Sequence, residues 1–396
     1  MTDRLVVDQQ EFEDLCNHFR EAGIVAFDTE FVSESTFQPD LCLLQFATNE
    51  QSAGVDPFEL DSLESWWEIM ADDKTTIVVH GGQAEIRFCR QLGGRSPRRL
   101  IDVQLAEGMR STSYPLGYGA LVSRVLGKRS HGKETRTDWR RRPLSERQVH
   151  YAMEDVEHLL PIWNAQRDSL KKLNRFEWAE EEFQRMIDDI ETDEGRDKWQ
   201  KVSGIHRLRR RELAVAIELS RFRESEAERR NQPLRRILRD DLLIELARRQ
   251  PVNSTELFAT RDMNRTHHKR AADDLIACIE RARAIPDDEL PSTAPFKKKE
   301  NSKDEHVLGQ LLAIALSNRC AEVGISKQLV GTSAELKRLV RHHVFSENDG
   351  RPPRLTEGWR AEVCGDLLTD LLDGKISLRV ADAESDHPLV FEPREQ

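Results

Sequence analysis

The chain has no uninterrupted run of eighteen apolar residues, and none of its cysteines stands close to another. A membrane-spanning helix needs about 20 apolar residues, so we expect no transmembrane segment. The six scattered cysteines lack the spacing of a zinc site or a disulfide framework. The first residues also lack the basic and then apolar pattern of a signal peptide. We therefore expect a soluble, reduced, intracellular protein with two to four domains.

Excess positive charge is confined to one part of an otherwise acidic chain. The 396 residues carry a formal net charge of −11, and residues 1–170 hold 19 Lys and Arg against 28 Asp and Glu. Residues 205–285 reverse this balance, with 19 basic and 13 acidic side chains. A basic module favours a polyanionic partner, although a solvated helical surface has a similar composition.

The segment 24–31 carries two carboxylates one residue apart, directly after a mostly apolar run. Side chains alternate between the faces of a β-strand, so Asp28 and Glu30 share a face and Thr29 points the other way. Two neighbouring carboxylates repel each other unless a positive charge lies between them. Hard divalent ions such as Mg²⁺ prefer oxygen ligands. The motif therefore indicates a metal site, and an ordinary strand end with two solvated acids remains the alternative.

Strands and helices alternate along the first part of the chain. Apolar or β-branched runs predict strands at 24–31, 41–47, 52–55, 75–79 and 99–103, and amphipathic patterns predict helices at 8–22, at 61–71 and after Gly81-Gly82. This alternation indicates an α/β domain with a mixed sheet. A helical pattern follows over residues 145–174, in which Tyr151 and Asp155 share one face because they are four residues apart.

The rest of the chain reads as helical modules joined by linkers. Residues 175–204 are acidic and helical, and residues 205–285 and 304–380 each carry helical stripes of apolar residues. The segment 286–303 contains proline, lysine and serine, which is typical of a linker. The residues after about 384 are expected to be loose.

Several short motifs follow one another along the chain: Asp28-Thr29-Glu30-Phe31, Val79-His80-Gly81-Gly82, Leu100-Ile101-Asp102-Val103-Gln104, Thr137-Asp138-Trp139, Arg142-Pro143-Leu144 and Tyr151-Ala152-Met153-Glu154-Asp155. In content and order they resemble the motifs of the ribonuclease D family, which belongs to the DEDD exonucleases of the type with Tyr in the third motif. Residues 205–285 resemble an HRDC domain, and the last module, with Glu357-Gly358-Trp359-Arg360 and Leu367-Leu368, resembles a second, more divergent one. The resemblance covers nearly the whole chain.

The resemblance implies a ribonuclease H-like α/β exonuclease domain with a mixed sheet, followed by two all-α HRDC-like domains. The implied divisions are an exonuclease domain (1–175), a helical linker (176–204), an HRDC domain (205–285), a linker (286–303), a second HRDC-like domain (304–380) and a flexible tail (381–396). The activity it implies is hydrolytic 3′→5′ exoribonuclease action on structured RNA precursors, tRNA 3′ ends above all. We further expect a monomeric cytoplasmic protein that binds RNA 3′ ends and no membrane.

The resemblance also implies two divalent ions, Mg²⁺ or Mn²⁺, of which one activates the attacking water and the other stabilises the leaving 3′ oxygen. Asp28, Glu30 and Asp155 match three of the four ligands of the family. Tyr151 matches the residue that orients the attacking water. Independently of the family, a helical face with Tyr151 and Asp155 can project toward the strand that carries Asp28 and Glu30.

The sequence departs from the family at the fourth ligand, because Glu85 stands where the family has Asp. Glutamate keeps the charge but adds one methylene, and Mg²⁺ tolerates errors in geometry poorly. Three outcomes are open: Glu85 reaches the metal after an adjustment or through a water, it favours Mn²⁺, or the second metal site is weak and the enzyme slow. We expect a functional Glu85, and we interpret Asp102 as structural or capping rather than as a substitute ligand.

The remaining polar candidates carry weaker signals. His80 is expected to form hydrogen bonds at the end of a strand, and Asp138 and Trp139 to order the arginine-rich loop. Candidate RNA contacts are Arg136, Arg140 and Arg141 in that loop and Arg209 and Arg210 in the basic module, although solvated arginines fit as well.

Two alternative functions remain at this level. One is a catalytically weak RNA-binding protein whose site is disabled by Glu85, and the other is a DNA-directed 3′→5′ exonuclease. HRDC-like modules also occur with helicases, so they do not separate RNA from DNA. The arrangement of all three domains favours RNA.

Overall fold

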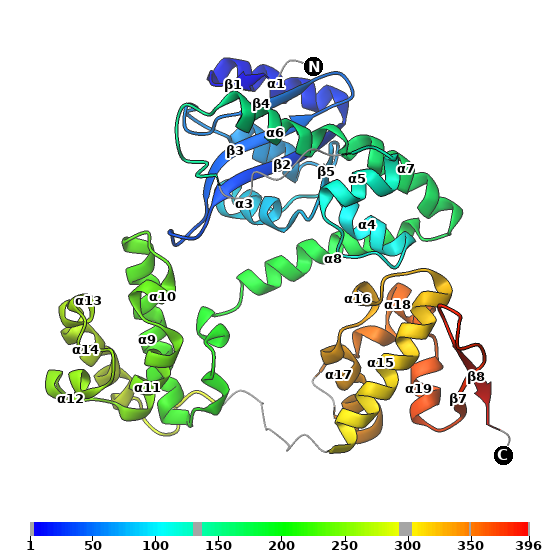
Figure 1. Ribbon diagram of the computed structural model, residues 1–396. Coiled ribbons are helices and arrows are strands. Elements are labelled where there is room, and N and C mark those ends of the chain that lie inside the picture. The colour runs from blue at the N-terminus through cyan, green and yellow to red at the C-terminus, as the bar shows by residue number, and fades with distance from the viewer. Residues whose placement is uncertain (1–3, 130–136, 293–302, 348–349, 395–396) are drawn as a thin grey trace.

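The computed structural model describes residues 4–129, 137–292, 303–347 and 350–394. Figure 1 shows an α/β part at the top and two separate groups of helices below it. Within the described residues, no helix is both long enough and apolar enough to cross a membrane.

The α/β part is built on a six-stranded mixed sheet with the strand order β1-β4-β3-β2-β5-β6. Its strands are β1 (Leu5–Val6), β2 (Ile24–Val32), β3 (Asp40–Ala47), β4 (Ser52–Val55), β5 (Thr76–Val79) and β6 (Leu100–Asp102). Strand β2 lies in the middle, antiparallel to β3 and parallel to β5. The predicted mixed sheet is confirmed. Strand β1, which pairs in parallel with β4, was not predicted because two residues are too short to show a period.

Strand β2 sends alternate side chains to two different cores. Val25 and Phe27 pack with α1 (Gln9–Ala22), α2 (Glu64–Ala71) and α3 (Gln83–Gly93). Ala26 packs in the other core with α4 (Val103–Arg110), α5 (Tyr118–Leu126), α6 (Glu146–Glu157) and α7 (Leu159–Lys172). By this alternation Asp28 and Glu30 belong to the face covered by α6, and Thr29 belongs to the face covered by α3.

The prediction of one helix over residues 145–174 was wrong. Helix α6 ends at Glu157, α7 begins at Leu159, and His158 separates them. Pro161 supplies a physical reason, because proline has no N–H to donate to the carbonyl of residue 157 and its ring crowds that carbonyl. The sequence therefore contained a signal for this break.

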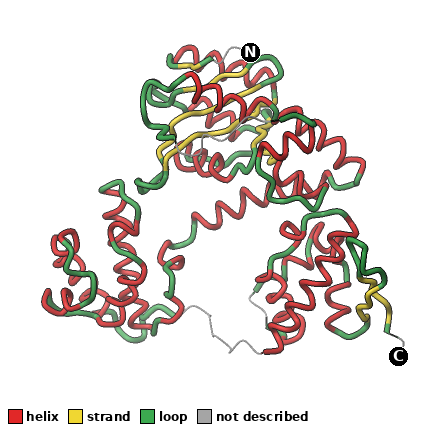
Figure 2. Tube along the Cα trace, viewed as in Figure 1, coloured by secondary structure: helices red, strands yellow, loops and turns green. Residues whose placement is uncertain are grey.

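The expected linker 176–204 also needs correction, because most of it is part of a core. Helix α8 (Phe176–Glu194) runs between the α/β part and the two groups of helices (Figures 1 and 2). Ala179 and Phe183 pack in the core with α4 to α7, and Ile187 and Ile190 pack in the core with α1 to α3. An amphipathic helix buries its apolar stripe, so α8 is a structural element of the α/β part.

The basic module forms its own hydrophobic core. It contains α9 (Arg210–Arg229), α10 (Leu234–Ile237), α11 (Asp240–Arg249), α12 (Ser254–Ala259), α13 (Thr266–Arg270) and α14 (Ala272–Ala284), preceded by the 3₁₀ turns η1 (Lys198–Lys201) and η2 (Ile205–Arg207). Leu213, Leu243 and Ile279 are among the buried residues of this core.

The C-terminal module shares a core with the α/β part. It contains α15 (Lys303–Val323), α16 (Lys327–Val330), α17 (Ser333–Phe345), the 3₁₀ turn η3 (Arg354–Thr356), α18 (Gly358–Cys364) and α19 (Leu367–Leu372). Leu312, Leu329 and Trp359 belong to the same cluster of buried residues as Val103 and Met109 of α4. This module is therefore docked on the α/β part through apolar packing.

The tail after about residue 384, which was expected to be loose, contains a strand of five residues. Strand β8 (Leu389–Pro393) pairs antiparallel with β7 (Ile376–Val380). Asn318 of α15 holds the start of β8, since its side chain accepts from Leu389 N at 2.8 Å and donates to Leu389 O at 2.9 Å. Two side-chain bonds from a distant helix were not visible in the sequence pattern.

A buried carboxylate also joins α8 to the C-terminal module. Glu182 accepts hydrogen bonds from Arg360 Nη2 at 2.9 and 3.0 Å and from Trp359 Nε1 at 3.3 Å. Arg354 of the same module and Arg185 of α8 also pair with Glu182. Burial lowers the pKa of Arg360 to about 10, which leaves it charged at neutral pH.

Candidate active site

Four carboxylates are carried by three neighbouring elements near the middle of the sheet. Asp28 and Glu30 lie on β2, Glu85 lies in the first turn of α3, and Asp155 lies on α6, which packs against β2, β3 and β4. Helix α3 starts just after β5, the parallel neighbour of β2, and this brings Glu85 to the same end of the sheet. A bulge between Glu30 and Phe31 changes the register with β3, and bulges of this kind redirect side chains.

The pKa values of these carboxyl groups show how strongly they interact. Burial, followed by the charges of Glu85, Asp155 and Glu30, raises the pKa of Asp28 well above its ordinary value. Burial and the charges of Asp155 and Glu85 raise the pKa of Glu30 to about 8. Burial raises the pKa of Glu85 to about 7 and that of Asp155 to about 6. Negative charge is therefore concentrated where water is partly excluded.

Stability should depend on pH because of these shifts. Carboxyl groups have a pKa of about 4 in unfolded chains, so between about pH 4 and pH 8 the folded protein binds more protons than the unfolded chain. Its free energy of unfolding then falls as the pH rises through the folded-state values. In EDTA we expect the thermal midpoint to fall between about pH 5.5 and pH 8.5, and Mn²⁺ to raise it most at the upper end.

The Glu30→Gln variant isolates the contribution of Glu30 to this pH dependence, because the variant keeps every other titrating group. Its thermal midpoint should depend less on pH than that of the unchanged protein. Equal slopes for the two proteins would contradict the assigned interaction of Glu30 with its neighbours.

Glu85 is held by a residue on the other face of β2. Thr29 Oγ1 donates a hydrogen bond of 2.6 Å to Glu85 Oε1, and both side chains are buried. This bond opposes the rise in the pKa of Glu85. Thr29 was not singled out from the sequence, although the alternation along β2 placed it opposite Asp28 and Glu30.

Tyr151 and Asp155 interact directly, as their spacing on one helical face predicted. The Tyr151 hydroxyl hydrogen-bonds to the Asp155 carboxylate, and this contact lowers the pKa of Asp155 against the larger effect of burial. Burial and the charge of Asp155 raise the pKa of Tyr151. The phenol therefore stays protonated and can donate a hydrogen bond at neutral pH.

The donor set suits a hard divalent ion, since carboxylate oxygens are the ligands that Mg²⁺ and Mn²⁺ prefer. Mutual repulsion within the cluster indicates a need for positive charge. In the described part of the chain, no three His, Cys, Asp or Glu side chains converge as a ready-made metal site. The bond between Glu85 and Thr29 directs one carboxylate toward the other face of β2.

The turn after β5 is fixed by Asp102. Its carboxylate accepts from the backbone N–H groups of Gly81 (3.0 Å), Gly82 (3.1 Å) and Gln104 (2.8 Å), so its predicted structural and capping role is confirmed. A Cβ at Gly82 would lie 2.3 Å from a methyl carbon of Val79, which excludes any larger residue there. This turn sets the start of α3 and hence the position of Glu85.

The arginines of the loop before α6 mostly make contacts within the protein. Arg140 pairs with Asp138 at 3.1 Å and lies 3.8 Å from Asp40, while Arg141 stays largely exposed. Arg142 pairs with Asp56 and donates to Cys42 O at 2.7 Å. Trp139 is buried in a small cluster with Cys42, in line with its expected ordering role. Arg136 lies outside the described residues.

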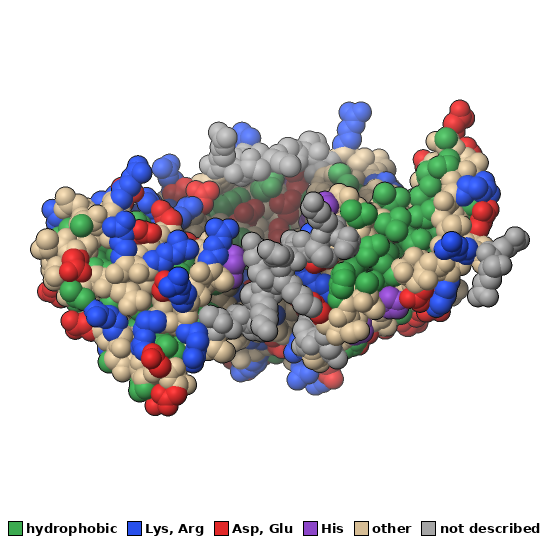
Figure 3. Space-filling model, turned by 90° about the horizontal axis from the view of Figure 1, so that it is seen from below, with side chains coloured by type: hydrophobic (Ala, Val, Ile, Leu, Met, Phe, Trp, Pro, Cys, Tyr) green, Lys and Arg blue, Asp and Glu red, His purple; other side chains and the backbone are tan. Residues whose placement is uncertain are grey.

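The arginines that open the basic module also make internal contacts. Arg210 donates to Leu290 O at 2.7 Å, and Arg209 N donates to Glu212 in the cap of α9. Figure 3 shows numerous Lys and Arg side chains on the surface of this module. The face of the module seen in this view is therefore rich in basic side chains, whereas Arg210 donates to a carbonyl oxygen within the protein.

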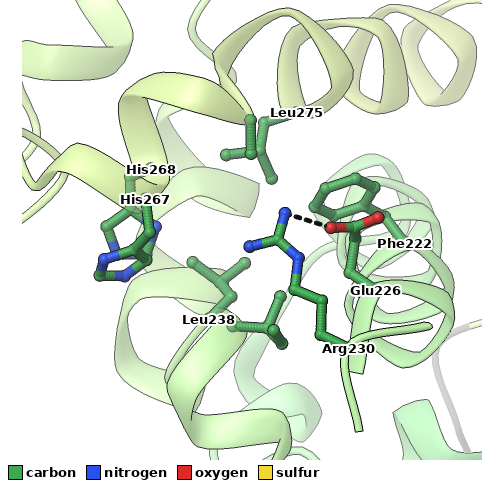
Figure 4. Close-up of a pocket in the computed structure, with 9 residues that line it drawn as sticks. Phe222, Glu226, Arg230, Leu238, His267, His268 and Leu275 are labelled. Carbon is green, nitrogen blue, oxygen red and sulfur yellow. Dashed lines mark ion pairs between the residues drawn. The ribbon is translucent and has the colours of Figure 1, made fainter. Parts of the chain in front are cut away.

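Neither described cavity coincides with the carboxylates. One, in the basic module, holds only about 10 Å³ between Leu238, His268 and Leu275, beside the ion pair of Arg230 and Glu226 (Figure 4). That volume suffices for a single water at most. The other, of about 470 Å³, lies at the opposite ends of β5 and β6 and is lined by residues such as Thr76, Leu100 and Arg167.

Comparison with known proteins agrees with this arrangement. The family model described as 3′-5′ exonuclease matches residues 4–171, and the model described as HRDC domain matches residues 212–279. Ribonuclease D of Granulibacter bethesdensis is 31% identical over 384 residues, which cover 95% of this chain and 94% of that protein. Ribonuclease D of Bartonella henselae is 29% identical and covers 96% of this chain and 93% of that protein.

The fold comparison extends over the same length. The crystal structure of Escherichia coli RNase D, described as an exoribonuclease involved in structured RNA processing, matches with a TM-score of 0.84 at 25% identity. The match covers 94% of this chain and 99% of that chain. The predicted ribonuclease H-like fold with following helical domains is thereby confirmed.

The α/β fold and its match to the 3′-5′ exonuclease model, with an HRDC domain after it, place the protein in the class of 3′→5′ exonucleases. This class of hydrolase cleaves phosphodiester bonds with the help of divalent metal ions. The chain belongs to the ribonuclease D family and is a 3′→5′ exoribonuclease.

Proposed function

We propose that Asp28, Glu30, Glu85 and Asp155 hold two divalent ions, Mg²⁺ or Mn²⁺, for hydrolysis of the terminal phosphodiester. The observation that carries this proposal is the placement of these carboxylates on β2, on the first turn of α3 and on α6. Beside the larger effect of burial, the charges of Glu85 and Asp155 raise the pKa of both Asp28 and Glu30. Bound ions would supply an activated water and charge stabilisation at the leaving 3′ oxygen. The carboxylates stay deprotonated as ligands because a cation compensates their repulsion.

In this proposal Tyr151 orients the attacking water. Its hydroxyl is a donor at working pH and already lies within hydrogen-bonding reach of Asp155. A phenol fixed on the same helical face as a ligand can hold a water in line with the bond that breaks. Tyr151 is thus a positioning donor for the nucleophile rather than a base.

The substrates we propose are structured RNAs with a free 3′ end, tRNA precursors above all, processed by a monomer in the cytoplasm. The relative from E. coli, described as acting in structured RNA processing, supports this class of substrate. Arg140, Arg141 and Arg209 remain candidates for phosphate contacts. We also propose an exonuclease unit that includes α8, an HRDC unit at 205–285 and a C-terminal unit that includes β8.

The direct test is shortening of a 3′-extended tRNA precursor in Mg²⁺ and in Mn²⁺, with a DNA strand of the same sequence as competitor. We expect stepwise removal of 3′ nucleotides from RNA and little loss from DNA. RNA binding without shortening in either ion would instead support a catalytically weak RNA-binding protein. Preferential shortening of DNA would support a DNA-directed exonuclease.

The Glu85→Asp variant tests the unusual ligand. An Asp at this position is shorter, so it should give up the bond to Thr29 and present its oxygens closer to α3. We expect Mg²⁺-supported activity to be kept or raised, and the ratio of Mg²⁺ to Mn²⁺ activity to increase.

The matched control is Glu85→Gln, which keeps the length but loses the charge. Its activity should fall at least about tenfold, since a charged ligand is lost. A large loss in Glu85→Asp would show that the site is built around the longer side chain. Full activity in Glu85→Gln would remove Glu85 from the set of ligands.

A further inference from the structure

The break between α6 and α7 lies immediately after the proposed ligand Asp155. In an uninterrupted helix the N–H of His158 would bond to the carbonyl of Glu154, four residues earlier. Pro161 interrupts the next part of this ladder, because it cannot donate to the carbonyl of Glu157. The backbone groups around His158 therefore need other partners.

The hydroxyl of Tyr118 supplies a partner for two of these backbone groups. It donates to Glu154 O at 2.7 Å and accepts from His158 N at 3.3 Å. One hydroxyl thus stands between the two groups that would otherwise bond to each other. A side chain inserted into a helical ladder is a recognised cause of a kink.

Tyr118 is held in place by His80, which directly follows β5. The ring of His80 meets the ring of Tyr118 edge to face, with centroids 5.8 Å apart. His80 Nε2 in turn lies 2.8 Å from Leu116 O, which confirms its predicted hydrogen-bonding role at the strand end. Burial raises the pKa of Tyr118, so its hydroxyl keeps the proton that it donates.

We propose that Tyr118 is a positioning residue for catalysis, which fixes the direction of α6 at the residue directly before Asp155. The bond to Glu154 O sets the main chain from which Asp155 projects, and Tyr151 lies one helical turn earlier on the same face. Tyr118 touches neither substrate nor metal in this role. The inference depends on the proposed role of Asp155 as a ligand.

The test is Tyr118→Phe, which removes the hydroxyl and keeps the ring against His80. The matched control is Tyr114→Phe, because Tyr114 is also half-buried and no hydrogen bond from its hydroxyl occurs among the described residues. For both variants we would measure kcat at saturating RNA, the Kd for RNA, the thermal midpoint, and the Mn²⁺ affinity of RNA-free protein by calorimetry.

We expect Tyr118→Phe to lower kcat by between about tenfold and 10²-fold, because small displacements of catalytic groups are costly. Mn²⁺ binding should weaken, and the Kd for RNA should stay within about twofold. Tyr114→Phe should change neither kcat nor Mn²⁺ affinity. Unchanged kcat and Mn²⁺ affinity in Tyr118→Phe would overturn the inference, as would a lower thermal midpoint with normal turnover.

Asp155→Asn, assayed in parallel, separates this inference from the proposed function. An inactive Asp155→Asn beside a fully active Tyr118→Phe would overturn only the role of Tyr118. An active Asp155→Asn would overturn the ligand assignment on which both depend.

Discussion

Asp28→Asn and Asp155→Asn should each reduce exonuclease activity by about 10³-fold or more, with the fold unchanged. In the proposed site, each substitution replaces a carboxylate that would hold an ion by an uncharged amide. Charge stabilisation by a bound ion is worth several kcal/mol in the transition state, and each 1.4 kcal/mol is about tenfold in rate. The measurement is single-turnover shortening of a labelled RNA with Mg²⁺ or Mn²⁺ at saturating enzyme.

The same Asp28→Asn variant should be more stable than the unchanged protein in EDTA. A charged Asp28 destabilises the folded protein, because it is buried and because three neighbouring carboxylates repel it. The uncharged amide of Asn avoids both costs. Mn²⁺ should raise the thermal midpoint of the variant less than that of the unchanged protein. Near-normal activity in either variant would show that the metal assignment is wrong.

Glu182→Gln should cause a large loss of stability, of about 3–5 kcal/mol. The amide keeps the shape of the side chain but leaves the buried guanidinium of Arg360 without its partner. Arg354 and Arg185 also lose the carboxylate that lies between them. The thermal midpoint should fall on the order of 10 °C in a scanning calorimeter.

Asp188→Asn is the matched control for this prediction. It lies on the same helix α8, and its side chain accepts from Gln184 at an exposed position, where such contacts contribute little. Its thermal midpoint should stay within about 2 °C of that of the unchanged protein. Equal behaviour of the two variants would show that Glu182 does not stabilise the docking of the C-terminal module.

Local patterns predicted the sheet and most of its helices because burial repeats with the period of each element. The β-branched run before His80 became β5, and the alternation along β2 separated Thr29 from Asp28 and Glu30 as expected. The capping box of Ser145 and Gln148 at the start of α6 is likewise a local feature. Each of these features depends on residues within a few positions of one another.

Contacts between distant residues were missed. The helix break at His158 had a local signal in Pro161. The hydroxyl that accepts from the N–H of His158 belongs to Tyr118, however, which lies forty residues earlier. Helix α8 was taken for a linker because its apolar stripe does not reveal which surfaces cover it. The arginines around position 210 were read by charge alone, whereas the structure gives them carbonyl partners.

The sequence by itself determined the family, most of the strands of the sheet and which carboxylates are candidates for the site, because these follow from motifs and short periods. Only the tertiary structure showed that Glu85 bonds to Thr29, that Tyr118 anchors the helix of Asp155, and that the C-terminal module shares a core with the α/β part. The physical reason is that hydrogen-bond partners and covered surfaces are set by packing between segments far apart in the chain. A single sequence records the groups that need partners but not which partners they find.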